Sequence, residues 1–455
     1  MTPATARVPV AAPERLPLAT HVGYGLGAVA TGAYGTAPSL LLLFFMTDTL
    51  GVPASLAALG LFVVKAWDVA IDPVIGTISD RTRSRWGRRR PYLMTGAVLL
   101  GLSLSLLFAV PALASANARF AWVLGMFFVT STTFSLYSVP YIAMPAEMTD
   151  DYHERTSLMS YRMAFMSVGV LVAGGLAPLV RDLAGGGRAG YAVMSLALGA
   201  ICFTFMTISV VATRRVRFTE HVERPIGVRA QWALAWANRP LVALLLVFLV
   251  QMSAIGCVIA ALPYYVTYVL ERGGAVFSLG FVVLTVVSIL AMPLWVRVSR
   301  RVGKAVGLAL SLLLFAAAAL AMLPLASDLP LTWFYSITAV MGVGFAGTQL
   351  FPFAMLPDVI DHDVAQSGLR REGVFSGVWM AAEGVGMALG GLAAGAVLDG
   401  TGFVESTTGT AAQPASALVG IRVAFAVVPP LLLVLSAATL RASAAFTRPP
   451  AGRRR

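Results

Sequence analysis

The sequence predicts an all-α integral membrane protein with twelve transmembrane helices. Of its 455 residues, 58% are hydrophobic and only 12% are charged, whereas soluble domains carry about 25% charged residues. The charges are clustered, and long uncharged stretches separate the clusters. Such a chain cannot bury its apolar surface in one aqueous core, so lipid must solvate much of it.

Twelve apolar runs are long enough to cross a bilayer, for which about 20 residues suffice. We place these spans at 22–46, 54–78, 92–112, 119–145, 158–180, 191–213, 240–269, 275–296, 304–325, 331–354, 374–398 and 416–440. We expect residues 1–21 to form a cytoplasmic tail rather than a cleavable signal peptide. Residues 441–455 form a second, basic tail.

Basic residues are concentrated in every second loop. The basic set lies near residues 81–90, 214–239, 297–304, 370–371 and 453–455. The opposite set of loops holds only Arg119, Arg181, Arg188, Arg272 and Arg422. Cytoplasmic loops carry the excess of Lys and Arg, so we expect a multi-pass protein of the plasma (inner) membrane with both termini in the cytoplasm. The net charge of +12 then reflects topology in a lipid bilayer, and no nucleic-acid partner is expected.

The longest polar connection, at 214–238, divides the chain into two six-span halves, 22–213 and 239–440. After its second span, each half has a basic turn that contains a glycine, Gly87 in the first half and Gly303 in the second. Two parallel six-span repeats are the plan of major facilitator transporters. We therefore predict two pseudo-symmetric six-helix bundles in the major facilitator fold.

Three ionisable residues, Lys65, Asp68 and Asp72, lie near the middle of the second span. Each costs roughly 2.5–3.5 kcal/mol at a helix centre, so they should face a polar interior. Asp68 and Asp72 are four residues apart and share a helix face; they could bind sodium, share a proton, or pair with Lys65. A structural ion-pair network is the alternative. Two acids with one base leave a negative charge unpaired, which favours a cation-coupling site.

Other polar and aromatic residues in apolar spans are candidates for a substrate cavity. Glu383 stands alone in a glycine-rich span, and an acid at that depth is a site candidate, although it could instead pair with a buried base. Gln251 could equally form an interhelical hydrogen bond. Tyr34 and Trp379 could stack on a ring-shaped substrate, although aromatic residues are also common in core packing.

Charged residues of both signs occupy the cytoplasmic loops of both halves. We interpret them as gate salt bridges, formed in the outward-facing state and broken in the inward-facing state; solvated charges without coupling are the alternative. These gate candidates are Asp80, Arg81, Arg88, Glu147, Arg155, Asp358, Asp361 and Arg371.

The stretch from Trp67 to Gly76, followed by the basic segment from Asp80 to Pro91, resembles the glycoside–pentoside–hexuronide:cation symporter family. Segments 145–162 and 358–376 match the family as well, and the resemblance extends from about residue 22 to residue 440. It implies the major facilitator fold and cation-coupled transport.

The resemblance also implies roles for individual residues. Asp68 and Asp72 match the cation-site aspartates of the family, and Lys65 matches a basic residue one turn before them. Ser135 falls where a hydroxyl of the fourth span helps to hold the ion. Arg162 matches an arginine of the fifth span that lines the cavity.

Four positions depart from the family pattern. Gly32 and Ser138 stand where family members have galactoside-binding aspartates, although Ser138 remains a cavity candidate. Ile71 replaces a polar amide beside the second cation aspartate, and Glu383 replaces a lysine. The cation pair is therefore kept while the galactoside clamp is absent, and the loss of the amide oxygen favours protons over sodium.

Together these features predict a secondary active transporter that couples a proton or a sodium ion to symport of a sugar-like or other small polar solute. We expect alternating access, a functional monomer and no cofactor. The alternatives are a proton-coupled exporter of a hydrophobic metabolite or drug, and transport of lysolipids. An enzyme is not expected, because no nucleophile elbow, zinc-binding HExxH, paired cysteine motif or phosphate loop is present.

Overall fold

The computed structural model describes residues 16–149, 151–214, 236, 238–367, 372–409 and 411–442. Within these ranges the chain consists of helices joined by turns, with no β-strand. The predicted central loop and the predicted C-terminal tail lie almost entirely outside the described residues, as do residues 1–15 of the predicted N-terminal tail and the gate candidate Arg371. The last four residues of the predicted N-terminal tail, 18–21, belong to the first helix instead.

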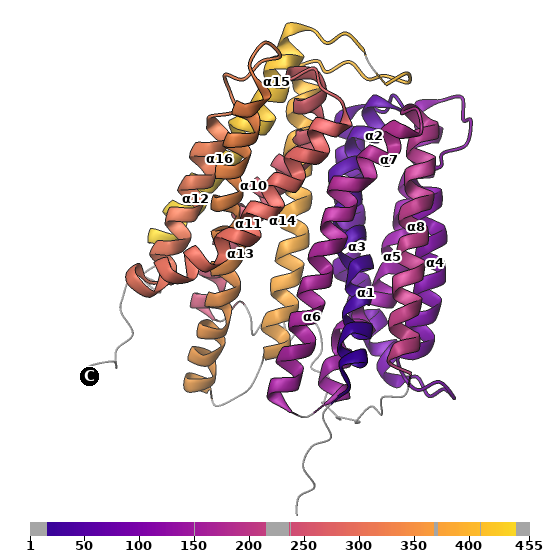
Figure 1. The fold of residues 1–455 in the computed structure, drawn as a ribbon, viewed down its shortest axis with the longest axis vertical. Helices are drawn as coiled ribbons and strands as arrows, with labels where there is room; N and C mark the ends of the chain where they lie inside the picture. Colours follow the sequence, from indigo (N-terminus) through magenta and orange to yellow (C-terminus); the bar gives the residue numbers. More distant parts are fainter. Residues whose placement is uncertain are drawn as a thin grey trace, which may run out of the picture.

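The first six spans form the N-half (Figure 1). Its elements are α1 (Leu18–Ala37), the π-helical turn η1 (Pro38–Leu42), α2 (Leu43–Asp48), α3 (Ala54–Arg81), α4 (Arg90–Phe108), α5 (Ala116–Met148), α6 (Tyr152–Leu171), the π-helical turn η2 (Val172–Leu176), α7 (Ala177–Leu183) and α8 (Gly187–Ala212). The first span comprises α1, η1 and α2, and the fifth comprises α6, η2 and α7.

The remaining six spans form the C-half. Its elements are α10 (Arg239–Tyr264), the π-helical turn η3 (Tyr265–Val269), α11 (Gly274–Val302), α12 (Lys304–Leu320), α13 (Leu331–Ser367), α14 (Glu372–Gly400), α15 (Ala415–Ala426) and α16 (Val428–Ala442). In the described part, 11 helical stretches are long and apolar enough to cross a membrane, and α12 is a shorter apolar helix. The predicted all-α architecture of twelve spans is thus confirmed.

Several predicted span boundaries were wrong. The third span ends at Phe108 rather than at residue 112, shortly before Pro111, and the ninth ends at Leu320 rather than at residue 325. By contrast, α13 continues to Ser367, well past the predicted end at residue 354. Hydropathy marks where a helix leaves the apolar layer, and a helix can continue beyond that point into polar surroundings.

The last span, predicted at 416–440, is not one continuous helix. It breaks at Val427, and α16 then begins just before Pro429 and Pro430. Two consecutive prolines lack the N–H groups that would continue the helical hydrogen bonds of the preceding turn. The break is therefore encoded locally.

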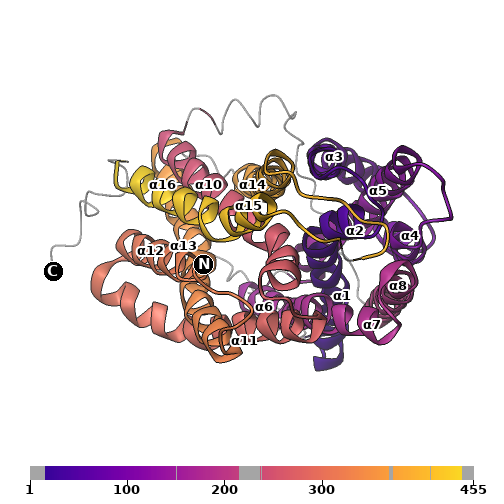
Figure 2. The ribbon, with the colours of Figure 1, turned by 90° about the horizontal axis from the view of Figure 1, so that it is seen from above.

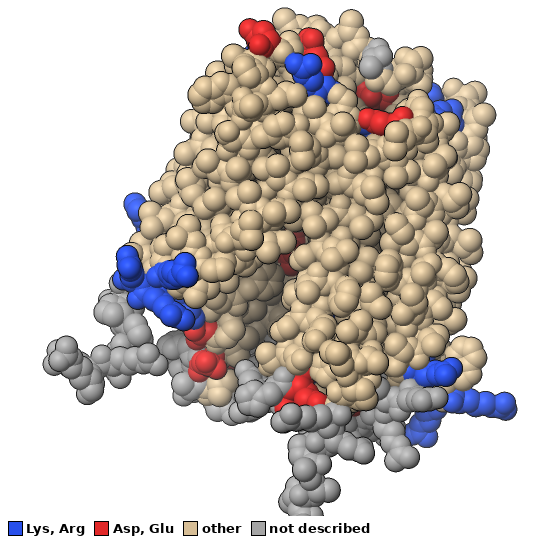
Figure 3. Space-filling model, in the orientation of Figure 1, with Lys and Arg blue, Asp and Glu red and all other residues tan. Residues whose placement is uncertain are grey.

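The two halves stand side by side (Figures 1 and 2), and three spans of the N-half each contact one span of the C-half. The N-half helix α3 packs against α14, η1 packs against α10, and η2 with α7 packs against α11. Figure 3 shows a hollow between the halves that opens toward one end. We call this the basic end, because Arg88, Arg89, Arg300, Arg301 and Lys304 lie there.

Two glycines permit the close approach of the halves. A Cβ atom on Gly174 would lie 2.1 Å from the ring of Phe281, and one on Gly395 would lie 2.4 Å from the Cβ of Ala58. Real Cβ atoms do not approach other atoms this closely, so the contacts require small residues, as is common between membrane helices.

The repeated basic turns adopt similar backbone conformations. Gly87 has φ of 90° and Gly303 has φ of 83°. Only glycine adopts such angles without strain. The weak sequence repeat between the halves therefore corresponds to a repeated backbone turn.

Candidate functional site

Helix α3 directs its ionisable residues to one face. Lys65, Asp68 and Asp72 are spaced at i, i+3 and i+7, which aligns them along the helix. The Lys65 Nζ atom lies 3.1 Å from Oδ2 of Asp68. It also lies 5.6 Å from the ring centroids of Tyr34 and Phe127. The side chains of Lys65 and Asp68 are 24% and 22% exposed, so this ion pair is only partly shielded from water.

The two carboxylates differ in their partners. Asp68 accepts a hydrogen bond from the Ser131 hydroxyl on its second oxygen, so both of its oxygens have partners. Asp72 lies beside Ser135, and its Oδ1 atom is buried without a hydrogen-bond partner in the described part. Lys65 therefore neutralises Asp68, and Asp72 forms no ion pair with any described residue.

Helix α5 supplies the hydroxyl groups that face these acids, from Ser131 and Ser135. Ser131, Ser135 and Ser138 are spaced at i, i+4 and i+7, on one face of α5, and all three are buried. Sequence analysis identified Ser135 and Ser138 but missed Ser131. The regular spacing of the three serines was the signal that could have revealed it.

A second contact fixes the register of α3 against α5. The indole Nε1–H of Trp67 donates to the hydroxyl of Thr132 over 3.0 Å. Adjacent residues of α3, Trp67 and Asp68, thus bind adjacent residues of α5, Thr132 and Ser131. The position of the Asp68 carboxylate therefore depends on both helices.

Arg162 on α6 lies beside a tyrosine cluster. Its guanidinium carbon lies 5.9 Å from the ring centroid of Tyr141, and its Nε atom is buried without a hydrogen-bond partner among described residues. Tyr141 stacks on Tyr24 with ring centroids 4.7 Å apart and donates to the Tyr24 carbonyl over 2.6 Å. The tyrosines are thus rigidly held, while the guanidinium retains a free donor.

Glu383 lies in α14, the helix of the C-half that packs against α3. Its side chain is partly exposed. It forms no ion pair or hydrogen bond with any residue of the described part, so it does not pair with Lys65 or Arg162 in this conformation. The suggested role as an ion-pair partner of these bases is therefore not observed.

Three residues predicted to line the cavity are buried in this conformation. Gln251 is fully buried and donates to the carbonyl of Thr348 over 2.8 Å, which is the alternative interhelical role. Trp379 is 1% exposed and stacks on Phe248 with ring centroids 3.9 Å apart. Tyr34 is buried as well, although its ring faces the Lys65 ammonium group.

The gate candidates of the N-half form a compact cluster at the basic end. The Arg89 Nε–H donates to Glu147 over 2.8 Å, and Arg88 binds the same carboxylate. Arg89 also pairs with Asp80 over 3.0 Å. Each of these ion pairs joins residues of one half.

The C-half has a smaller ion pair at the same end. Lys304 binds Asp358 with an Nζ–Oδ2 distance of 2.6 Å, and Asp361 is exposed. In the N-half, Arg155 donates to the carbonyl of Thr149 over 2.8 Å, and Arg81 is exposed. Among described residues, no ion pair at this end joins the two halves, and the proposed gating role of these charges stays a prediction.

The halves are instead bonded together at the opposite end, which we call the closed end. The hydroxyls of Thr47 and Tyr264 are 2.6 Å apart, and the Ser406 amide donates to the Thr47 carbonyl over 3.0 Å. The next residue, Asp48, accepts a hydrogen bond from the Tyr268 hydroxyl. Thr47 and Asp48 end the first span, whereas their partners belong to the C-half.

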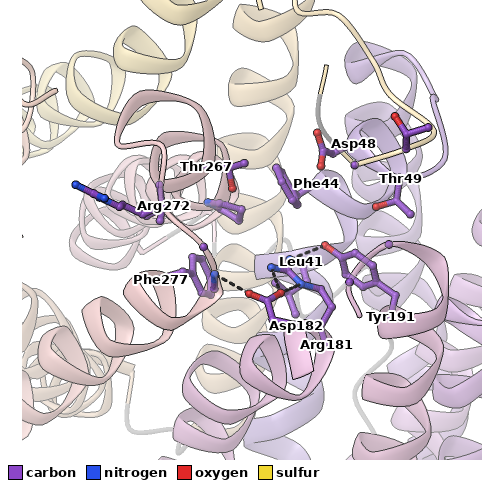
Figure 4. Close-up of a pocket in the computed structure, with 18 of the residues that line it drawn as sticks. Leu41, Phe44, Asp48, Thr49, Arg181, Asp182, Tyr191, Thr267, Arg272 and Phe277 are labelled. Carbon is purple, nitrogen blue, oxygen red and sulfur yellow. Dashed lines mark hydrogen bonds and ion pairs between the residues drawn. The ribbon is translucent and has the colours of Figure 1, made fainter. Parts of the chain in front are cut away.

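A pocket of about 440 Å³ lies between the halves at the closed end (Figure 4). Asp182, on α7, accepts a hydrogen bond from the Gly274 amide over 2.7 Å. Arg181 binds Asp182 through Nε over 2.7 Å and also donates to the Tyr191 hydroxyl over 3.1 Å. Sequence analysis identified none of these closed-end contacts.

Comparison with known proteins places these features in context. Residues 23–442 match the family described as MFS/sugar transport protein. An uncharacterized symporter of Bacillus subtilis, YnaJ, is 31% identical over 430 residues, which cover 93% of this chain and 91% of that protein. The putative glycoside/cation symporter YagG of Escherichia coli is 27% identical, covering 92% of this chain and 90% of that protein.

A solved structure has a similar fold. It is a bacterial homolog of the human lysosomal transporter Spinster in an inward-facing, occupied conformation. The two chains superimpose with a TM-score of 0.67 at 14% identity, covering 95% of this chain and 98% of that one. At this identity the likeness shows the fold alone.

Proposed function

Because this chain belongs to the MFS/sugar transport protein family, it is a membrane transporter and not an enzyme, and we propose that it couples entry of a monovalent cation to symport of a sugar-like solute. The resemblance identified in the sequence is thereby confirmed at the level of the family. The following paragraphs give the support for the coupling ion, the solute and the orientation in the membrane.

The unequal pairing of the two carboxylates carries the proposal. Lys65 neutralises Asp68 over 3.1 Å, which leaves Asp72 as a negative charge that no described residue compensates, with one buried oxygen that has no partner there. A buried charge without a partner is unfavourable, so a bound cation stabilises the cluster. Binding of one cation leaves the cluster neutral, so the loaded site can change its exposure from one side of the membrane to the other.

The coupling ion is a proton or a sodium ion. Asp72 and Ser135 supply oxygen ligands, and the carbonyl of Val69 has no helical N–H partner because Pro73 cannot donate one. However, both oxygens of Asp68 are already engaged. A proton needs only the Asp72 carboxylate, and we propose it as the preferred ion.

The solute site lies between the halves. Arg162 offers a donor that has no partner among the described residues of the protein, and Glu383, on α14 of the C-half, offers a carboxylate acceptor. Donors and acceptors of this kind bind hydroxyl groups, and the glycoside in the name of one relative is the substrate class we propose. One chain supplies both sides of the site, which supports function as a monomer.

The orientation follows from the charges. We propose that the basic end faces the cytoplasm, by the positive-inside rule, and that the protein lies in the inner membrane with both termini cytoplasmic. The hollow of Figure 3 then opens to the cytoplasm, so this conformation is inward-facing and the closed end is extracellular.

Uptake by membrane vesicles tests the proposal. Vesicles that contain the protein are given an inward proton gradient, an inward sodium gradient or neither, together with a panel of labelled glycosides. We expect accumulation of at least one glycoside under the proton gradient. Accumulation driven by sodium alone would identify sodium as the ion, and an absence of accumulation for every solute under both gradients would contradict symport of sugar-like solutes.

A further inference from the structure

The closed end contains a helix cap that crosses between the two halves. Helix α11 begins at Gly274, and its N-terminal N–H groups have no partners within the helix. The Gly274 amide donates instead to the Asp182 carboxylate, 2.7 Å away, on α7 of the N-half. A carboxylate at a helix N-terminus satisfies an unpaired donor and interacts favourably with the helix dipole.

The surrounding residues are built for this contact. A Cβ atom on Gly274 would lie 2.3 Å from Oδ2 of Asp182, so any larger residue would displace the carboxylate. On the other side, Arg181 binds Oδ1 of Asp182 and is itself held by Tyr191. The arginine thus orients the carboxylate and leaves Oδ2 directed at the helix of the other half (Figure 4).

A second carboxylate of the N-half at this end also accepts a hydrogen bond from the C-half. Asp48, also of the N-half and 3% exposed, accepts the hydroxyl hydrogen of Tyr268 from the C-half. In both contacts the N-half supplies a carboxylate and the C-half supplies an uncharged donor. Such hydrogen bonds are short-ranged, so they are lost as soon as the halves separate at this end.

We propose that Asp182 is a positioning residue of the extracellular gate, which it closes by capping α11 of the opposite half. The proposal rests on the alternating-access function proposed above and assigns part of its gate to specific residues. In the outward-facing state the cap is broken. Weakening it therefore shifts the population of molecules from inward-facing to outward-facing.

Ser278 provides a reporter for opening at this end. It lies one turn below Gly274 and one turn above Phe281, on the face of α11 that contacts the fifth span. It is 2% exposed, and its hydroxyl has no partner among described residues, so Ser278→Cys is a small change. The natural cysteines, Cys202 and Cys257, are fully buried, and protein without the reporter supplies the background.

The experiment measures the rate at which a membrane-impermeant maleimide labels Ser278→Cys in right-side-out and inside-out vesicles. Loss of an N-cap costs ~1 kcal/mol, so Asp182→Ala should raise the rate about fivefold in right-side-out vesicles. Gly274→Ala should raise it similarly, because its methyl group displaces the carboxylate. The double variant should exceed neither single variant, since both remove one contact.

Matched controls separate gating from general loosening. Gly125→Ala adds a methyl group into open space, and Asp328→Asn neutralises an exposed acid at the closed end; neither should alter labelling. If Asp182→Ala fails to reach the membrane, Asp182→Asn keeps the oxygen acceptor without the charge and should raise the rate about twofold.

Two results would contradict the proposed gating role of Asp182. One is an unchanged labelling rate in the Asp182 and Gly274 variants, and the other is an equal increase in both vesicle orientations, which would indicate a purely structural role. Labelling requires neither solute nor cation. A positive labelling result without glycoside uptake would therefore contradict the proposed substrate class while leaving the gate supported.

Discussion

Replacement of Asp72 by asparagine tests the cation cluster most directly. The change keeps the size of the side chain but removes the one negative charge that Lys65 does not neutralise. Because the Lys65–Asp68 pair, 3.1 Å apart, is untouched, the helix packing around it should persist. We expect a protein that inserts normally and still carries solute across the membrane, but no longer couples that movement to a cation.

The size of the effect follows from the charge. One uncompensated carboxylate binds one cation in each cycle, and one charge that moves through ~100 mV gains about 2.3 kcal/mol, which corresponds to an approximately 50-fold solute gradient. Without the charge on residue 72, the final ratio of internal to external solute should fall to about 1. The expected change is thus an approximately 50-fold loss of accumulation.

The assay compares accumulation with exchange in right-side-out vesicles. Asp72→Asn should lose accumulation under an imposed potential but retain exchange of labelled for unlabelled glycoside, which requires no net cation movement. Asp68→Asn should lose accumulation as well, because Lys65 is then free to neutralise Asp72. Asp328→Asn, at an exposed acid far from the cluster, should behave as the parent protein. Normal accumulation in both the Asp72 and the Asp68 variant would refute the reasoning.

Three further predictions concern other parts of the transporter. Glu383→Gln should insert normally and bind solute more weakly, as measured by competition with labelled glycoside; a failure to insert would instead assign Glu383 a structural role. Ser131→Ala should raise the apparent proton affinity of the acid pair about tenfold or more, because the lost hydrogen bond to the charged Asp68 contributes about 1.5–3 kcal/mol and its removal favours protonation; an unchanged affinity would contradict this. Alanine at Arg88 or Asp80 should shift molecules toward the inward-facing state and slow uptake without altering the final ratio, so a changed ratio in the absence of leak would exclude a role in gating.

The positions of the spans and of the central acids followed from the sequence because they depend on local properties. Apolar runs of sufficient length mark membrane helices, and the spacing of Asp68 and Asp72 places both on one helix face. The glycines of the repeated turns, Gly87 and Gly303, were likewise recognisable, and both have positive φ angles.

Contacts between distant helices were not predictable in the same way. Ser131 reaches Asp68 only because of the register of α5 against α3. Gln251 could face a cavity or a neighbouring helix, because an amide side chain in an apolar span is compatible with either position. Asp182 binds an amide 92 positions further along the chain; in the sequence it is simply an acid at the end of a span. The paired glycines at 273 and 274 were the only local sign of that contact.

The location of the bonds between the halves indicates how the two ends differ energetically. Four hydrogen bonds among the described residues join the halves, and all lie at the closed end. The two with uncharged acceptors are worth ~0.5–1.5 kcal/mol each and the two with carboxylate acceptors ~1.5–3 kcal/mol each, so together they contribute about 4–9 kcal/mol to closure.

At the basic end, Arg88 and Glu147 are already paired within the N-half, and Lys304 and Asp358 within the C-half. Closure there would exchange some of these partners and could add pairs from the exposed Arg81 and Asp361, but an exposed pair is worth only ~0–1 kcal/mol. Ion pairing alone therefore cannot offset the closed-end bonds, and the empty protein should favour the inward-facing state. Opening to the outside then requires compensation at the basic end, such as apolar burial there, and weakening any closed-end bond, the Asp182 cap among them, should shift the balance toward the outward-facing state.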